Sequence, residues 1–234
     1  MKIPEILRTD QIDNAVLLLS SYYNKPQPGK TALRSGARFD TWAGGGDAPD
    51  VANMLTADDF LAASFLSVRF SPKAVIGILE HRREVVADLL AEIPADLDLV
   101  DVTHENFKSV LGEESAAWQL WDLLRGKDLP GKESWGIGPT KASKLMARKR
   151  PRLIPIWDSV VRKETGLKDS GTQWSDWHEV LTQNEGALAG HLDDIQQRAD
   201  LQHSISPLRV MDVVLWMHGT GGIAQPPTGE DETA

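Results

Sequence analysis

The stretch that decides the fold runs from residue 129 to residue 146 and reads LPGKESWGIGPTKASKLM; the segment PRLIPIWDSVVR follows at 151–162. At its centre stands Gly136-Ile137-Gly138. Two glycines around one apolar residue allow a tight turn with positive φ and a close approach of another backbone. We therefore expect this turn to join two helices in a helix-hairpin-helix module over residues 117–163.

The hairpin also predicts a phosphate contact. The first backbone N–H groups of a helix have no partner within it and, together with the helix dipole, they suit a phosphate oxygen. We expect these groups to face outward after Gly138, with Lys141 and Lys144 adding charge to a contact that holds a duplex without reading its sequence. The predicted DNA-binding residues are Gly136, Ile137, Gly138, Thr140, Lys141 and Lys144. The alternative is an ordinary helix–helix turn that binds nothing.

The distribution of charge favours the same place. A formal net charge of −9 by itself argues against a nucleic-acid partner. Between residues 122 and 168, however, twelve Lys and Arg stand against five Asp and Glu, a net of +7, so the remainder carries −16. This basic band coincides with the hairpin. Its run 148–152 is either a DNA contact or a solvated helix end, where cations also favour the helix dipole.

The rest of the chain predicts an all-α fold, with one domain over residues 1–218 made of two closely packed helical lobes. Residues 24–55, rich in Gly and Pro, form a loop long enough to be functional or disordered, and 219–234 are typical of a disordered tail. Apolar periodicity and capping residues give the helix ranges. We expect helices at about 9–22, 56–68, 71–92, 104–111, 113–125, 138–148, 174–183, 186–199 and 206–217, and one that begins just after Asp158.

The segment Ile154-Pro155-Ile156-Trp157-Asp158 follows the hairpin, with Asp158 placed 20 residues after Gly138. Hairpin and segment together resemble the helix-hairpin-helix superfamily of DNA glycosylases, with the 8-oxoguanine glycosylase/endonuclease-like fold. Its members carry a Gly-hydrophobic-Gly hairpin, a helix, and a Pro-hydrophobic segment ending in an aspartate that begins another helix. Ala142 matches a small packing position. The resemblance covers about 45 residues, and the whole chain resembles an uncharacterised actinobacterial branch.

The resemblance implies a monofunctional DNA glycosylase of base-excision repair, which hydrolyses the N-glycosidic bond of a modified base. The target nucleotide would turn out of the duplex into a cleft between two helical lobes. Asp158 would stabilise the oxocarbenium-like charge and orient or deprotonate a water. Members that also cut the strand carry a lysine two residues after the second glycine, where this chain has Thr140, so we expect no lyase activity. The alternative for Asp158 is a plain helix N-cap.

Other residues and the composition complete the prediction. Trp42, in the long loop, and Trp157 are the candidates to bind the base by stacking. The absence of cysteine excludes disulfides, thiol catalysis and iron–sulfur clusters. The six histidines lack paired metal-site spacing, so we expect no metal and no cofactor.

Three function classes stay open: a glycosylase, a non-catalytic DNA-binding protein, and a helical protein-interaction domain. No apolar run reaches the roughly 20 residues that span a bilayer, and the N-terminus lacks the apolar core of a signal peptide. We expect a cytoplasmic protein without membrane association. Nothing in the sequence sets its oligomeric state.

Overall fold

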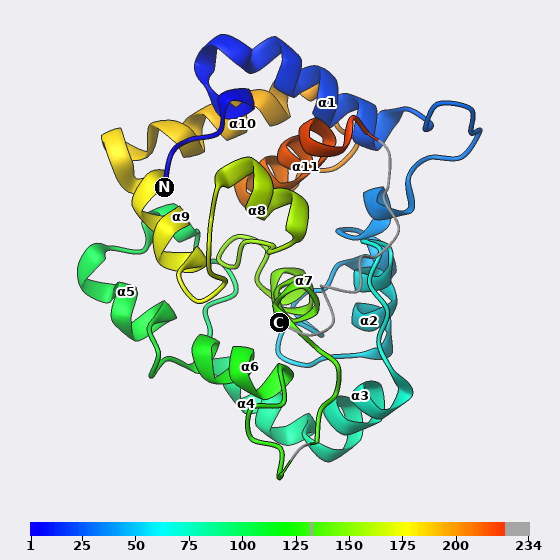
Figure 1. The fold of residues 1–234 in the computed structure, drawn as a ribbon, viewed down its shortest axis with the longest axis vertical. Helices are drawn as coiled ribbons and strands as arrows, with labels where there is room; N and C mark the ends of the chain where they lie inside the picture. The colour runs from blue at the N-terminus through cyan, green and yellow to red at the C-terminus, as the bar shows by residue number, and fades with distance from the viewer. Residues whose placement is uncertain (132, 223–234) are drawn as a thin grey trace.

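The computed structural model describes residues 1–131 and 133–222, and this part of the chain is helical and contains no strand (Figure 1). The predicted all-α class is confirmed. The helices are α1 (Ile12–Asn24), α2 (Ala57–Ser64), α3 (Pro72–Ile76), α4 (Arg83–Glu92), α5 (His104–Leu111), α6 (Ala116–Leu124), α7 (Pro139–Lys149), α8 (Ser159–Thr165), α9 (Gln173–Thr182), α10 (Ala187–Ala199) and α11 (Pro207–Thr220). Short turns lie between them: η1 (Glu5–Leu7), η2 (Thr9–Gln11), η3 (Ser35–Arg38), η4 (Trp42–Gly44), η5 (Gly77–His81), η6 (Leu99–Asp101) and η7 (Gln183–Gly186).

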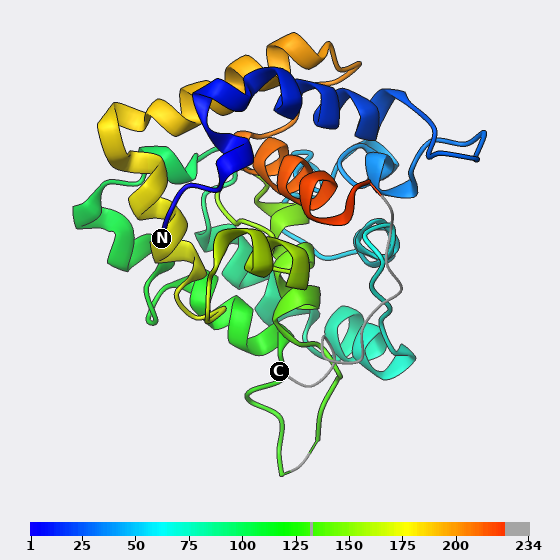
Figure 2. The same cartoon turned by 45° about the horizontal axis from the view of Figure 1, so that its top comes forward.

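The helices form two groups with α7 between them (Figures 1 and 2). One group brings the first helix beside the last two, since α1 packs against α10 and α11, and α11 packs against α8. The other group contains the middle of the chain, from α2 to α6. Helix α7 packs against α2 and α6 and is buried along its whole length. The side chains of α7 are therefore in contact with the rest of the protein.

Capping residues set several helix starts as the sequence predicts. Thr56 and Asp59 form the capping box of α2, in which the Thr56 N–H donates to Asp59 Oδ2 over 2.8 Å. At the start of α3, Ser71 Oγ accepts the Ala74 N–H. At the far end of the chain α11 continues to Thr220, beyond the expected domain end at 218. Residues 223–234 of the predicted tail lie outside the described residues.

One predicted helix was wrong. The expected helix over 71–92 is divided into α3, the π-helical turn η5 and α4, with a break at Arg82, whose φ is −116°. The division occurs where the Trp135 indole packs on Gly77, so closely that a Cβ there would lie 3.0 Å from the ring. The chain widens by a π turn at this contact, a distortion that apolar periodicity does not reveal.

The basic run at the end of α7 is neither a solvated helix end nor a surface, which corrects both interpretations of it. Arg148, Lys149 and Arg150 are exposed by only 3, 1 and 1%. Arg150 donates to the carbonyl oxygens of Ala52, Leu90 and Ile93. Of this run, Arg152 is about half-exposed and pairs with Asp98.

The same cations hold the long loop 24–55 in place. Arg148 donates to the carbonyl oxygens of Phe39, Asp40 and Trp42, and Lys149 donates to that of Gly46 over 2.8 Å. A Cβ on Gly46 would overlap the Arg148 carbonyl oxygen, so this position requires glycine. The loop is therefore anchored to α7 by buried charge-assisted hydrogen bonds.

Asp59 supplies the negative charge for this cluster. Its Oδ2 lies 2.8 Å from Lys149 Nζ and its Oδ1 lies 3.4 Å from Arg148 Nε, with all three side chains at most 2% exposed. Buried cations are tolerated only when they are paired and hydrogen-bonded. Asp59 thus joins α2 to α7 while also capping α2.

We expect Asp59→Ala to lower the free energy of unfolding by about 3–5 kcal/mol, because it leaves two buried cations without their counter-charge. The control is Asp58→Ala at the adjacent, exposed position, which loses a hydrogen bond to the Trp42 indole and should cost about 1 kcal/mol or less. Urea unfolding followed by circular dichroism measures both. A loss from Asp59→Ala no larger than that of the control would contradict this prediction.

Candidate functional site

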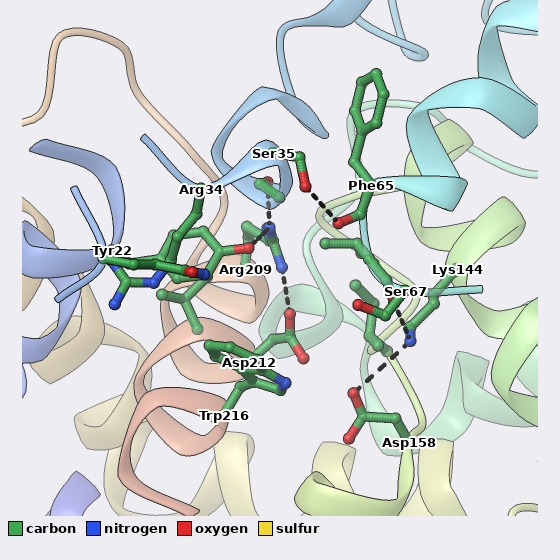
Figure 3. Close-up of a pocket in the computed structure, with 15 residues that line it drawn as sticks. Tyr22, Arg34, Ser35, Phe65, Ser67, Lys144, Asp158, Arg209, Asp212 and Trp216 are labelled. Carbon is green, nitrogen blue, oxygen red and sulfur yellow. Dashed lines mark hydrogen bonds and ion pairs between the residues drawn. The ribbon is translucent and has the colours of Figure 1, made fainter. Parts of the chain in front are cut away.

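A cavity of about 70 Å³ opens where the two groups of helices meet (Figure 3). Its walls come from α1, η3, the turn after α2, α7, the segment before α8, and α11. The charged residues that line it are Arg34, Lys144, Asp158, Arg209 and Asp212. The aromatic residues that line it are Tyr22, Phe65 and Trp216. A small cavity with this many charged groups is unusual for a core and marks a candidate site.

Asp158 is the N-cap residue of α8, and its two carboxylate oxygens have different partners. Oδ1 accepts the N–H groups of Val160 and Val161 over 3.0 and 2.9 Å. Oδ2 lies 3.8 Å from the Nζ of Lys144, on the cavity side (Figure 3). Capping and contact with a ligand were alternatives in the sequence analysis, but the geometry allows both at once, one for each oxygen.

Lys144 points into the cavity rather than outward. Its Nζ donates to the Leu66 carbonyl oxygen over 3.0 Å, and its side chain is 6% exposed. The ammonium therefore lies between the turn after α2 and Asp158. This corrects the expectation that Lys144 reaches out to a phosphate.

Helix α11 contributes an arginine and a carboxylate to the opposite wall. The Arg209 guanidinium donates to Asp212 through Nη1 and to the Gly36 carbonyl oxygen through Nη2, the second over 3.1 Å. It also reaches Tyr22 Oη at 3.3 Å and Asp40 Oδ2 at 3.1 Å. One buried guanidinium thus ties α11 to α1 and to the long loop.

Asp212 is a carboxyl group of the cavity with a perturbed pKa. Burial raises the pKa of its carboxyl group to about 6, Arg209 opposes this rise, and the negative charge of Asp158 adds to it. Both the protonated and the ionised form of Asp212 are therefore accessible close to neutral pH.

The hairpin has the predicted turn but not the predicted exposure. Gly136 has a φ of +65°, as the Gly-Ile-Gly pattern predicts. Ile137 belongs to the core, and Thr140 and Lys141 in the first turn of α7 are 3 and 7% exposed. Lys141 Nζ donates to the Gly136 carbonyl oxygen over 2.7 Å. The expectation that these groups face outward is corrected: in this structure the hairpin is an internal turn.

Neither predicted stacking tryptophan lines the cavity. Trp42 donates its indole N–H to Asp58 over 2.8 Å and packs edge-on against Phe65, with 5.3 Å between ring centroids. Trp157 is 8% exposed and packs in the core. The aromatic rings at the cavity are Tyr22, Phe65 and Trp216 instead.

The contribution of α11 to the cavity was not predicted from the sequence. Arg209, Asp212 and Trp216 recur at i, i+3 and i+7 and so share one face of this helix. The available signal was a pair of opposite charges inside the apolar stretch 207–217, which reads PLRVMDVVLWM. Tyr22 and Arg34 offer no comparable signal, because only the tertiary fold brings them to the cavity.

The described residues give no sign of a metal site or a membrane span. Within residues 1–131 and 133–222, no three histidine or acidic side chains are grouped to hold a metal ion. No helix in this part of the chain combines the length and the apolar character needed to cross a membrane.

The raised pKa of Asp212 makes stability depend on pH. Because the pKa is higher in the folded than in the unfolded state, the folded state binds the proton more tightly. That stabilisation is complete below pH about 4 and is lost as pH rises through about 6. The parent should lose this stabilisation as pH rises from 4 to 8, whereas Asp212→Asn has no carboxyl group to titrate. The free energy of unfolding of Asp212→Asn relative to the parent should therefore rise by about 3 kcal/mol over this range. Urea unfolding across this range measures it. Asp50→Asn, at an exposed position, is the matched control. A difference between Asp212→Asn and the parent that does not change with pH would refute the raised pKa.

Comparison with known proteins places the chain at the level of a family. A family model described as a family of unknown function, DUF6308, matches residues 15–219. No curated protein and no solved structure matches the chain. Because the matched residues include most of both helical groups and the cavity between them, the chain belongs to the DUF6308 family.

Proposed function

We propose that this protein binds DNA and that its cavity is the active site of a monofunctional DNA glycosylase. The observation that carries the proposal is that the two carboxylate oxygens of Asp158 have different partners. Oδ1 is fixed by two amides of α8, so Oδ2 is held in the cavity in one orientation. A carboxylate oriented before the substrate arrives stabilises a developing positive charge at no further cost of reorganisation. The motif resemblance points to the same aspartate.

The surrounding groups suit hydrolysis of an N-glycosidic bond. A volume of about 70 Å³ accommodates about two water molecules, one of which would be the nucleophile. Oδ2 of Asp158 would face the anomeric carbon, where the oxocarbenium-like charge develops. Tyr22, Phe65 and Trp216 supply aromatic surface for a base turned out of the duplex.

Entry of a base requires the cavity to widen. The turn after α2 is the wall best suited to move, because Ser67 has a φ of +62°, a left-handed conformation that is strained for serine. Besides its backbone hydrogen bonds to the end of α2, this turn accepts side-chain hydrogen bonds from Lys144 Nζ, at the Leu66 carbonyl oxygen, and from Ser35 Oγ, at that of Phe65 over 3.3 Å. Both lie at the cavity, so a ligand that competes for Lys144 or Ser35 would also release the turn.

Exposed cations at the rim of the cavity are the groups that would meet DNA phosphates. Residues 25–38 contain four Lys or Arg and no acidic residue. Lys25, Lys30 and Arg38 are exposed, and they flank Gln27 and Ser35, which line the cavity. The blue loop after α1 projects from the body of the molecule in both views (Figures 1 and 2). Phosphate contacts here would position a duplex over the cavity.

We expect Asp158→Asn to abolish base excision without unfolding the protein. Asparagine caps a helix about as well as aspartate but lacks the charge, so excision should fall by at least about 100-fold while the melting temperature stays close to that of the parent. Asp158→Ala is the matched control, because it loses the cap as well as the charge. The assay scores abasic sites in duplexes that carry a panel of modified bases.

Excision that persists in Asp158→Asn would remove this residue from the catalytic role. Absence of abasic sites from the parent protein on every duplex would overturn the enzyme proposal. A non-catalytic DNA-binding domain or a protein-interaction domain would then be the function to test.

DNA affinity should fall steeply with salt concentration and should depend on the exposed cations at the rim of the cavity. The triple variant Lys25→Ala, Lys30→Ala, Arg38→Ala should lower the slope of log affinity against log salt by about 2–3, close to one per phosphate contact. A second triple variant, Lys2→Ala, Arg83→Ala, Lys108→Ala, removes the same charge from exposed positions away from the cavity. Fluorescence anisotropy with a labelled duplex measures both. Equal slopes for the two variants would exclude the rim as the DNA contact.

A further inference from the structure

Two carboxylates face the same cavity from opposite walls, and their surroundings differ. Asp158, before α8, accepts two backbone N–H groups and lies beside the Lys144 ammonium. Asp212, on α11, is buried, and its pairing partner Arg209 also serves Asp40. Environments that set two acids apart in this way are typical of sites in which one acid carries the proton and the other the charge.

We propose that Asp212 is a second catalytic carboxyl group, which donates its proton to the departing base while Asp158 remains the anion. This inference rests on the proposed glycosylase function. It concerns a residue outside the segment 129–162 that carries the family resemblance.

The orientation of Asp212 supports proton donation. One of its oxygens accepts from Arg209, and the other is turned toward the space between α11 and Asp158 (Figure 3). A proton on this second oxygen would point to the place where the base must sit. No cation other than Arg209 makes a hydrogen bond to Asp212 among the described residues.

The charged and titratable groups around Asp212 come from every wall. Arg209 on α11 and Lys144 on α7 favour its ionised form, whereas burial and the Asp158 carboxylate favour the protonated form. Tyr22 on α1 lies close enough for its own pKa to respond to Asp212. Burial is the largest of these effects and outweighs the two cations. The pKa of about 6 leaves the proton available near neutral pH.

The chemical step balances with water as the only co-reactant. The bond between the anomeric carbon and the base nitrogen breaks, and its electron pair goes to the base. The proton of Asp212 passes to the base, which leaves neutral, while Asp158 Oδ2 faces the sugar cation. Water then adds to the anomeric carbon, and the proton that it loses returns to the ionised Asp212.

The same charges indicate the class of substrate. With Asp212 protonated, the cations Arg34, Lys144 and Arg209 still outnumber the anions Asp158 and Asp40, the second of which pairs with Arg209 behind the cavity wall, so the cavity disfavours a base that is already cationic. An uncharged base is a poor leaving group until it is protonated, which is what Asp212 would supply. We therefore assign the site to uncharged modified bases rather than to cationic alkylated ones.

The test compares single-turnover excision from duplexes that carry uracil, hypoxanthine or 7-methylguanine, the last as a cationic base. For the parent protein, the rate on an uncharged base should fall as pH rises above about 6. Asp212→Asn should lower that rate at pH 6 by about 100-fold or more and flatten the profile. Any excision of 7-methylguanine should be affected far less. Carbon-13 NMR of the Asp212 carboxyl group in the full chain reports its titration separately from activity.

The matched control is Asp40→Asn, which removes the other carboxylate of Arg209 but lies outside the cavity lining. It should keep the falling pH profile. An unchanged profile in Asp212→Asn, equal losses on charged and uncharged bases, or an NMR midpoint near 4 would overturn this inference while leaving the glycosylase proposal standing. Absence of abasic product from the parent on every duplex would instead overturn both.

Discussion

The burial of Arg148, Lys149 and Arg150 at the end of α7 is the constraint on which the rest of the fold depends. Cations without partners in a protein interior would cost several kcal/mol each, so carbonyl groups and a counter-ion must come to them. The carbonyls come from the long loop and from the end of α4, and the carboxylate is Asp59 on α2. The loop thereby acquires a fixed path, and η3 is brought to the wall of the cavity.

The same helix connects this anchor to the chemistry. One turn before the buried cations, Lys144 reaches Asp158 and the turn after α2. Beside it, Ser143 Oγ donates to the Trp157 carbonyl oxygen and accepts the Trp157 N–H, so the residue before Asp158 is held on α7 at both of its polar groups. The distance between Lys144 and Asp158 is therefore set by backbone contacts and not by the ion pair alone. A site built this way keeps its geometry when one charge is removed.

The sequence was sufficient for local structure and insufficient for the assembly. Caps at Thr56 and Ser71, the left-handed Gly136, and a helix start after Asp158 follow from side-chain and backbone preferences within a few residues. The direction of the basic side chains of α7 could not be foreseen, because four Lys or Arg in eleven residues are typical of a solvated face. Arg148 and Lys149 bond to main-chain carbonyls 108 and 103 residues away, and any sequence supplies such groups. The partner of Arg209 on α1 is also distant in sequence, so the residues of α11 by themselves predict only an ordinary core helix.

The burial of the cations at 148–150 also changes what the net charge implies about a DNA partner. Arg148, Lys149 and Arg150 of the basic band are buried, the first two paired with Asp59. Lys141 and Lys144 are directed inward, so the band contributes less to the outer surface than its net of +7 suggests. An acidic protein can still bind a polyanion if its positive field is local, since charges beyond about 8 Å are largely screened at physiological ionic strength. The acid-free segment 25–38 meets that condition at the rim of the cavity. This segment belongs to the loop that Arg148 anchors at Phe39, Asp40 and Trp42, so the buried cations also set the position of the proposed DNA contact.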